Sequence, residues 1–375
     1  KGLINTIGAE VDEAFYKAVA SVAINPEVIK KANLSFVYTP FHGAGNIPVR
    51  EVLRRAGVQN IEVVKEQEMP DGNFPTVKSP NPENPEGFAL AIKLAKEKNI
   101  DLIIGTDPDS DRVGLIVRDK DGNYVPLTGN QTGALLVNYV LSQKKETGTL
   151  PKNAAVIKTI VTNEISDKIC AHYGADVFNV LTGFKFIAEK IKEFEESGSH
   201  TYVFGFEESY GYLPGTYVRD KDAVGASLLI AEMASYYKLR GMSVYDGLCE
   251  LFEKFGHFGE WVDNIYFEGV DGMERIAAIM NKLRDNAPDI IGGSRVVRYS
   301  DVLKGVTYNL QDGNEEKLSL PSSNVLRFVT EDGTFIAFRP SGTEPKFKIY
   351  TGFVCDDHET KKEALKKDIY ALIGR

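Results

Sequence analysis

The chain has few cysteines and no long apolar run. Its three cysteines, Cys170, Cys249 and Cys355, are odd in number and far apart, so the sequence predicts neither a disulfide framework nor a zinc site, and a cytoplasmic location is expected. No stretch of about 18 uncharged apolar residues occurs, which argues against a membrane-spanning helix. The opening KGLINTIGAEVDEAF is polar and mixed, unlike a secretory signal peptide.

Basic residues are also in deficit. Lys and Arg number 44 against 53 Asp and Glu, which gives a formal net charge of −9. A nucleic-acid-binding protein would carry a basic stripe, so no nucleic-acid partner is expected. Phosphate ligands are not excluded, because local Arg, Lys and backbone N–H groups set the electric field inside a cleft.

The chain is long enough for more than one hydrophobic core. It contains 375 residues, of which 43% are hydrophobic and 26% are charged, a composition typical of globular proteins. A single core rarely grows to this size, so two or three domains are predicted.

Strand and helix patterns alternate along the first two thirds of the chain. Apolar, β-branched runs predict strands at residues 34–38, 61–64, 101–105, 113–117, 154–160, 175–181 and 202–206. Helical patterns fall at residues 49–56, 86–98, 164–173, 184–194, 223–239 and 244–255, and one more begins near Gln131. After residue 261, strands at 261–267, 325–330, 334–338 and 347–353 are bracketed by helices at 273–284 and 358–373.

These patterns predict an α/β fold class with three domains. Two successive three-layer α/β domains with mixed sheets are expected at residues 1–128 and 129–256, because strands and helices alternate there. A smaller α+β domain is expected at residues 257–375, because its strands are grouped between helices.

The most informative segment reads GTDPDSDR, between two apolar strand patterns. Its carboxylates at Asp107, Asp109 and Asp111 lie in one tight loop, where they repel each other unless a cation lies among them. Hard oxygen ligands favour Mg²⁺ or Ca²⁺, and the adjacent Arg112 indicates a phosphate in the same site. A calcium-binding EF-hand is excluded, because its sixth and twelfth positions hold arginines here instead of Gly and Glu. The loop is typical of phosphoryl transfer.

Three further loops carry groups that suit a phosphorylated sugar. RPSGTEPK (339–346) offers a guanidinium, hydroxyls, an ammonium and a glycine that lets backbone N–H groups converge on an anion. GFEESYG (205–211) offers carboxylates that can accept hydrogen bonds from sugar hydroxyls, although a solvated acidic turn explains it equally well. TGFK (182–185) lies where a strand pattern gives way to a helix pattern, the edge at which open α/β sheets bind ligands. The charged stretch RDKD (219–222) also suits the start of a helix.

Together and in this order, these loops resemble the α-D-phosphohexomutases, the family of phosphoglucomutase and phosphomannomutase. GTDPDSDR is similar to the family's metal loop, GFEESYG to its sugar-binding loop, RPSGTEPK to its phosphate-binding loop, and TGFKF to the loop that reads the orientation of the sugar. FHGAGNIPVREVLRRAG resembles the second domain. The variant GFEESYGYLPGTYVRDKDA looks most like bacterial phosphoglucomutases related to the phosphopentomutase branch.

The resemblance implies a role for each matching residue. Asp107, Asp109 and Asp111 would hold Mg²⁺, and Arg112 would contact the reacting phosphate. Lys221 would contact the substrate and assist proton transfer. Substrate binding would involve Thr182, Gly183, Glu207, Ser209, Arg339, Ser341, Gly342 and Thr343, with the last four at the phosphate that does not react.

The implied reaction interconverts glucose 1-phosphate and glucose 6-phosphate. An enzyme phosphoserine would give its phosphate to the substrate, and the resulting glucose 1,6-bisphosphate would turn over and return its other phosphate. Phosphomannomutase and phosphopentomutase activities are alternatives, and so is a non-catalytic protein that binds sugar phosphates. A phosphatase with an aspartyl nucleophile fits less well, because Ser110 and Asp111 depart from its Asp-x-Asp pattern followed by Thr or Gly.

The phosphoserine motif of the family, T-A-S-H-N-P, has no match in this chain. KSPNP at residues 78–82 is similar but lacks the histidine, and the first residue is Lys instead of Met. The resemblance therefore implies the second, third and fourth domains of a four-domain enzyme. The isolated chain is expected to be inactive, because its nucleophile would lie elsewhere.

Overall fold

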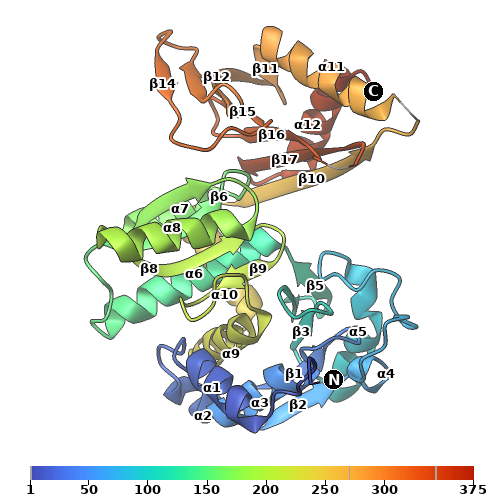
Figure 1. Ribbon diagram of the computed structural model, residues 1–375, viewed down its shortest axis with the longest axis vertical. Helices are drawn as coiled ribbons and strands as arrows, with labels where there is room; N and C mark the ends of the chain where they lie inside the picture. The colour runs from blue at the N-terminus through green and yellow to red at the C-terminus, as the bar shows by residue number, and fades with distance from the viewer. Residues whose placement is uncertain (1, 270, 343) are drawn as a thin grey trace. The chain divides into compact units, whose positions relative to one another are not determined.

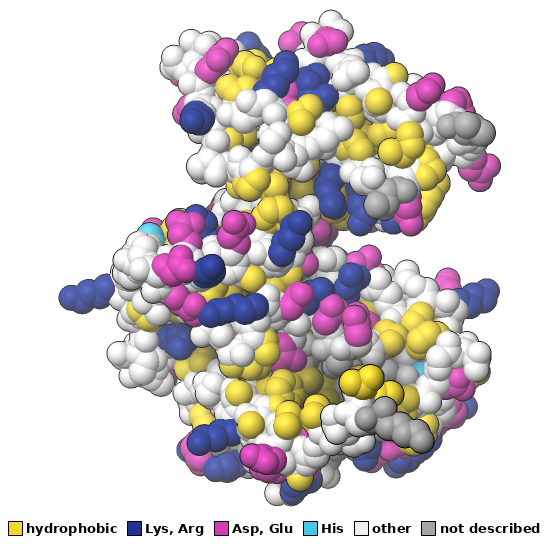
Figure 2. Space-filling model, in the orientation of Figure 1, with side chains coloured by type: hydrophobic (Ala, Val, Ile, Leu, Met, Phe, Trp, Pro, Cys, Tyr) yellow, Lys and Arg dark blue, Asp and Glu magenta, His cyan; other side chains and the backbone are white. Residues whose placement is uncertain are grey.

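The computed structural model describes residues 2–269, 271–342 and 344–375 and consists of two compact units (Figure 1). The first unit contains Lys1–Thr159 and Ser166–Leu251, and the second contains Ile160–Ile165 and Phe252–Arg375. Among the described residues, no helix is both long enough and apolar enough to cross a membrane. Described Lys and Arg side chains alternate with Asp and Glu over the face drawn in Figure 2.

The first unit begins with a mixed sheet that carries the GTDPDSDR segment (residues 105–112), called the Asp loop below. Its strand order is β2-β1-β3-β4-β5, formed by β1 (Ser35–Thr39), β2 (Asn60–Val63), β3 (Leu102–Thr106), β4 (Val113–Arg118) and β5 (Tyr124–Leu127). β1 pairs in parallel with β2 and β3, whereas β3, β4 and β5 run antiparallel in succession. β3 is buried along its whole length, as expected for a strand covered on both faces. The turn from β3 to β4 holds the three aspartates.

Helices and one 3-10 turn accompany this sheet. They are α1 (Ala9–Ala20), α2 (Glu27–Ala32), α3 (Asn46–Ala56), α4 (Lys65–Glu68), η1 (Pro85–Phe88) and α5 (Ala89–Lys98). α5 packs against β1 and β3. α3 follows the Gly-rich turn after β1 and ends at Gly57, whose left-handed φ of 107° suits a helix C-terminus.

A second mixed sheet in the same unit has the order β7-β6-β8-β9. Its strands are β6 (Ala154–Thr159), β7 (Asp176–Val180), β8 (Thr201–Glu207) and β9 (Gly211–Leu213), and its helices are α6 (Gly129–Glu146), α7 (Ile165–Tyr173) and α8 (Phe184–Ser197). Along β8, a β-carbon on Gly205 would meet Ile187 of α8, whereas Phe206 crowds Gly133 of α6. Because neighbouring strand residues face opposite sides, α8 and α6 cover opposite faces, and the layers are helix, sheet and helix.

Helix α9 (Ala223–Leu239) joins the two sheets. It is buried on nearly every side, which is where a helix without a polar face belongs. It contacts α2, α3 and β4 beside the first sheet, and α6 and β9 beside the second. This shared helix explains why both sheets belong to one compact unit.

The second unit is a larger antiparallel sheet with two helices. The order β10-β17-β16-β15-β12-β13-β14 comprises β10 (Phe258–Tyr266), β12 (Ser294–Asp301), β13 (Val306–Asn309), β14 (Glu315–Lys317), β15 (Leu326–Thr330), β16 (Phe335–Pro340) and β17 (Lys346–Val354), with β11 (Ile290–Ile291) paired to β12. The helices are α11 (Gly272–Asp285) and α12 (His358–Ile373), and α10 (Val244–Phe255) precedes β10. Apolar residues of both helices and of β10, β16 and β17 share one core.

The predicted fold class is confirmed. Two sheets with parallel and antiparallel pairs, each with helices, are followed by a C-terminal sheet domain whose strands are all antiparallel. The domain boundaries at residues 128/129 and 256/257 stay predictions.

Candidate active site and metal site

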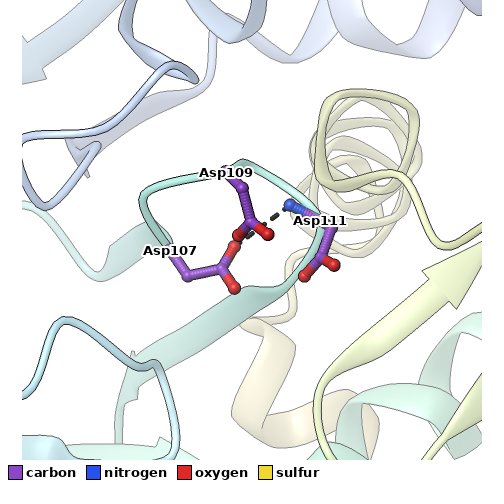
Figure 3. A group of neighbouring side chains, drawn as sticks. All are labelled: Asp107, Asp109 and Asp111. Atoms are coloured by element: carbon purple, nitrogen blue, oxygen red, sulfur yellow. Dashed lines mark hydrogen bonds between the residues drawn. The ribbon is translucent and has the colours of Figure 1, made fainter.

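The Asp loop is a tight turn that Asp107 organises. Its Oδ1 accepts the backbone N–H groups of Asp111 at 3.1 Å and Arg112 at 2.9 Å. Ser110 takes a left-handed φ of 58°, which tightens the turn. Figure 3 shows the three aspartates on this turn, with the N–H of Asp111 directed at the Asp107 carboxylate. One carboxylate oxygen from each of Asp107, Asp109 and Asp111 lies within 4.8 Å of the others.

The electrostatics of this loop suit a hard divalent cation. Burial raises the pKa of Asp107 to about 7, and the charges of Asp111 and Asp109 add to that rise, although the N–H of Arg112 opposes it. Oδ1 of Asp111 is buried without a hydrogen-bond partner among the described residues. Three carboxylates this close together repel each other, and a cation among them relieves that repulsion. Oxygen donors of this kind fit Mg²⁺ or Ca²⁺ better than softer metals.

The Gly-rich turn after β1 supports the Asp loop. Ala44 donates its N–H to the carbonyl of Pro108 at 2.7 Å, so the two loops lie in backbone contact. A β-carbon on Gly43 would lie 2.3 Å from Cα of Pro108, and no side chain could fit there without displacing the Asp loop. The requirement for glycine at residue 43 therefore follows from this tertiary contact and not from the local sequence.

His42, in the same turn, is committed to structural hydrogen bonds. Its Nδ1 lies 3.1 Å from the carbonyl of Met69 and its Nε2 lies 2.9 Å from Oγ1 of Thr76. Both ring nitrogens therefore have partners, and His42 connects the turn to the segment that contains Met69 and Thr76.

Arg112 lies among acidic groups. Its Nε is 3.7 Å from Asp111 Oδ1 and 3.9 Å from Asp107 Oδ2, and its Nη1 is 3.6 Å from Glu83 Oε1. None of these contacts is a close bidentate pair, and the side chain is 32% exposed. The guanidinium is thus held beside the Asp loop with donors left for an anion. Glu83 was not predicted as part of the site, because nothing in its local sequence marks it.

The loop after β8 adjoins the Asp loop. Arg112 and Gly211 form an antiparallel bridge, and Val113 donates its N–H to the carbonyl of Tyr210 at 3.1 Å. Tyr210 has a left-handed φ of 68°, a conformation that costs free energy for a bulky residue. Ser209 is half-buried in this turn. The fold therefore brings the predicted sugar loop against the predicted metal loop.

Glu207 connects the sugar loop with the TGFK turn. It ends β8, is 7% exposed, and accepts the N–H of Gly183 on Oε1 at 2.8 Å. Burial raises the pKa of Glu207, and that N–H together with the charges of Lys221 and Arg112 partly offsets the rise. Thr182 and Gly183 are therefore adjacent to Glu207 through the backbone of one turn.

Lys221 reaches the Asp loop from the segment before α9. Its Nζ lies 2.7 Å from Asp111 Oδ2. Burial lowers its pKa, but the hydrogen bond and charge of Asp111 outweigh this effect and leave the pKa raised. The neighbouring Asp222 caps α9 by accepting the N–H groups of Val224 and Gly225. The RDKD stretch therefore begins α9 and also places the Lys221 ammonium beside the Asp loop.

The RPSGTEPK loop belongs to the second unit and connects β16 to β17. Ser341 donates its N–H to the carbonyl of Lys346 at 2.7 Å, which closes the loop. Arg339 pairs across the two strands with Lys348, so two cations share one end of this hairpin. Gly342 is exposed. Thr343 lies outside the described residues.

Two domain models of one protein family match the chain. Phosphoglucomutase/phosphomannomutase alpha/beta/alpha domain II matches residues 13–122, and alpha/beta/alpha domain III matches residues 128–255. The chain belongs to this family. The resemblance of the motifs to phosphohexomutases is therefore confirmed, over more than half of the sequence.

Individual members agree with this membership. A phosphoglucomutase of Staphylococcus haemolyticus is 39% identical over 345 residues, which cover 92% of this chain and 61% of the relative. The chain thus spans about three fifths of the length of that curated relative.

Solved structures share the fold. The protein assigned as a phosphomannomutase in Thermus thermophilus has a TM-score of 0.68 and 19% identity, covering 100% of this chain and 68% of its own. Aspergillus fumigatus N-acetylphosphoglucosamine mutase, solved in complex with GlcNAc-6P and magnesium, has a TM-score of 0.54 and 12% identity, covering 100% of this chain and 67% of its own. At these identities the likeness concerns the fold alone.

Proposed function

We propose that this protein is a phosphoglucomutase, which interconverts glucose 1-phosphate and glucose 6-phosphate through glucose 1,6-bisphosphate and an enzyme phosphoserine. The single observation that carries the proposal is the meeting of Asp107, Asp109 and Asp111 with Arg112 and Lys221 at one loop. A carboxylate cluster flanked by two cations suits the transfer of a phosphoryl group. The name of the relative at 39% identity supports glucose as the sugar.

Asp107, Asp109 and Asp111 would hold Mg²⁺ through their clustered oxygens. Oδ1 of Asp111, which accepts no hydrogen bond among the described residues, and the all-oxygen donor set support this assignment, as does the magnesium in the Aspergillus mutase complex. When bound, Mg²⁺ supplies Lewis-acid stabilisation of charge on the transferring phosphoryl group. The N–H groups that fix Asp107 keep the ligand loop in place.

The reacting phosphate would be held by Arg112 and Lys221. The Arg112 side chain is 32% exposed, and its guanidinium would present donors to an anion. The Lys221 ammonium lies 2.7 Å from Asp111 Oδ2, and we assign it to substrate contact and to proton transfer at the reacting hydroxyl. General acid–base work by a lysine requires a lowered pKa, so the charge on Asp111 must first be neutralised.

The sugar would be held by the loop after β8. Glu207 uses Oε1 for the N–H of Gly183, which leaves Oε2 to accept hydrogen bonds from sugar hydroxyls. Ser209 would add a hydroxyl. Thr182 and Gly183, tied to Glu207, would select the orientation of the sugar.

The phosphate that does not react would be held by the hairpin loop of the second unit, with Arg339, Ser341 and Thr343 as side-chain donors and Gly342 as a source of backbone N–H. A sugar bisphosphate presents a phosphate at either end. One site that binds the distal phosphate in both orientations of the substrate would therefore serve both half-reactions.

The phosphoserine would come from outside these residues, since the 375-residue sequence contains no T-A-S-H-N-P motif. We therefore propose that the 375-residue chain alone does not turn over. The test is a coupled assay for Mg²⁺-dependent formation of glucose 6-phosphate from glucose 1-phosphate, primed with glucose 1,6-bisphosphate. The chain is compared with the same chain expressed together with its upstream coding region.

Turnover that requires the upstream region would support the proposal. Turnover by the 375-residue chain alone would overturn the external nucleophile. Parallel assays with mannose 1-phosphate and ribose 1-phosphate decide between sugars, and faster conversion of either one would reassign the substrate. Binding of these sugar phosphates without turnover in any form of the protein would favour a non-catalytic sugar-phosphate-binding protein.

A further inference from the structure

Lys221 holds one oxygen of a proposed metal ligand. Its Nζ lies 2.7 Å from Asp111 Oδ2, and the two side chains are only 14% and 27% exposed. The ammonium also lies 3.6 Å from Asp220, but that carboxylate is 69% exposed and so contributes less. Oδ1 of Asp111 is buried and without a hydrogen-bond partner in the described part of the chain. The Lys221 ammonium therefore lies close to the Asp111 carboxylate, which is also suited to bind a divalent cation.

The backbone directs Lys221 to this position. On its C-terminal side, Ala223 donates its N–H to the carbonyl of Ser110 at 3.1 Å, inside the Asp loop. The aliphatic part of Lys221 passes over Gly211, where a β-carbon would lie 2.5 Å from Cδ of Lys221. The contact with Gly211 and the backbone hydrogen bond of Ala223 therefore restrict the movement of the Lys221 side chain.

We propose that Lys221 and the divalent cation compete for Asp111, so that binding of the cation releases the Lys221 ammonium toward the substrate. This inference rests on the proposed function, in which the three aspartates hold Mg²⁺. An ammonium and a doubly charged cation on one carboxylate repel each other. The ammonium neutralises part of the Asp loop before the cation arrives, and afterwards its nearest strong acceptor is a bound phosphate.

This exchange would order the two binding events. Without the cation, Lys221 is paired with Asp111 and offers little to a phosphate. With the cation in place, the same ammonium becomes a donor for the substrate. The Asp loop and the segment before α9 are therefore coupled. Lys221 becomes available to the substrate phosphate only when the metal site is filled.

The first test compares Mg²⁺ binding by the 375-residue protein and its variants, with MgCl₂ titrated in a calorimeter. Lys221→Met keeps the apolar stem and removes the competing charge, so Mg²⁺ should bind about tenfold more tightly than to the wild type. Arg219→Gln is the matched control: it removes a positive charge from the same segment, but its guanidinium pairs with Glu195, so the affinity should not change. Equal or weaker binding by Lys221→Met would overturn the competition.

The second test uses the wild-type protein and so does not depend on a variant that folds. Acetylation of lysines by an N-hydroxysuccinimide ester is followed residue by residue by mass spectrometry, with and without saturating MgCl₂. Acetylation of Lys221 should rise severalfold with Mg²⁺, while that of Lys192, which is 70% exposed on α8, stays constant. Unchanged or reduced acetylation of Lys221 would contradict its release.

The outcomes separate this inference from the proposed function. Absence of Mg²⁺ binding in both the wild type and Lys221→Met would overturn the metal site itself, and the competition with it. Binding to both with the same affinity, together with its loss in Asp109→Asn, would leave the metal site established and overturn the competition alone.

Discussion

The carboxylate of Glu207 accepts the backbone N–H of Gly183 at 2.8 Å. Glu207 is the last residue of β8, and Gly183 directly precedes α8. Gly183 has a φ of 117°, a region that glycine adopts readily and other residues rarely do. One hydrogen bond therefore connects the proposed sugar-gripping loop to the proposed orientation loop, and the two loops are expected to act together.

Replacement of Glu207 should weaken sugar-phosphate binding strongly. Glu207→Ala removes the proposed acceptor for sugar hydroxyls and leaves the Gly183 N–H without its partner, so the affinity for glucose 1,6-bisphosphate should fall roughly 100-fold. Glu207→Gln keeps an oxygen for Gly183 and should lose less. Calorimetric titration with the bisphosphate measures both. Glu193→Ala, an exposed residue of α8, is the control and should bind as the wild type does.

The contact between Gly43 and Pro108 should make the Asp loop sensitive to a single methyl group. A β-carbon at residue 43 would lie 2.3 Å from Pro108 Cα, so Gly43→Ala forces one of two backbones to move. We expect a loss of about 1–3 kcal/mol in the free energy of unfolding and weaker Mg²⁺ binding. Urea denaturation and calorimetry measure the two effects. Gly72→Ala, where nothing lies within 4 Å of the added carbon, should change neither.

Mg²⁺ binding should depend on pH through Asp107, whose pKa is raised to about 7, first by burial. A proton on this carboxylate competes with the cation, so the affinity should fall as the pH decreases below about 7, by at most tenfold per pH unit for this one group. Calorimetric titrations at several pH values between 6 and 8 measure the slope. A flat affinity over that range would contradict the assignment of Asp107 as a ligand.

The raised pKa of Asp107 should also make the metal-free protein less stable as the pH rises, whereas Mg²⁺ binding should strengthen. The folded form binds the Asp107 proton more tightly than the unfolded chain does, so this contribution to stability is complete below the ordinary carboxyl pKa. It is lost as the pH rises toward about 7. Urea denaturation in the presence of a chelator should show this loss in the wild type but not in Asp107→Asn.

Glu232 should be important for stability rather than for binding. It is fully buried on α9 and accepts the N–H groups of Ile24 and Asn25 at 3.0 and 2.7 Å and the hydroxyl of Tyr139 at 2.7 Å. Glu232→Ala leaves three donors without their acceptor and should lower the free energy of unfolding by about 3–5 kcal/mol.

Urea denaturation measures this loss. Glu232→Gln, which retains one acceptor oxygen, should lose less than Glu232→Ala. The exposed Glu196 of α8 provides the control variant Glu196→Ala, whose stability should equal that of the wild type. A Glu232→Ala protein as stable as that control would contradict the structural role.

Long helical segments of the fold could be predicted from the sequence. The predicted helices at 223–239, 244–255 and 358–373 coincide with α9, α10 and α12, because each is a long segment with clear boundary signals. The N-terminal helices α1 and α2 were not predicted, and neither were β12, β13 and β14. β14 is exposed throughout, so it lacks the apolar alternation by which strands are recognised.

The sequence by itself determined the chemistry of the Asp loop, because Asp107, Asp109, Asp111 and Arg112 are brought together by one turn that local strand patterns predict. The resemblance of the motifs also predicted Lys221, Gly183 and Glu207 as site residues, but only the tertiary structure decided which of their atoms meet. The contacts of Lys221 with Asp111, Gly183 with Glu207, and Gly43 with Pro108 join segments far apart in the chain. They depend on how strands order within a sheet and how α9 packs between two sheets, and no local pattern of residues specifies that packing.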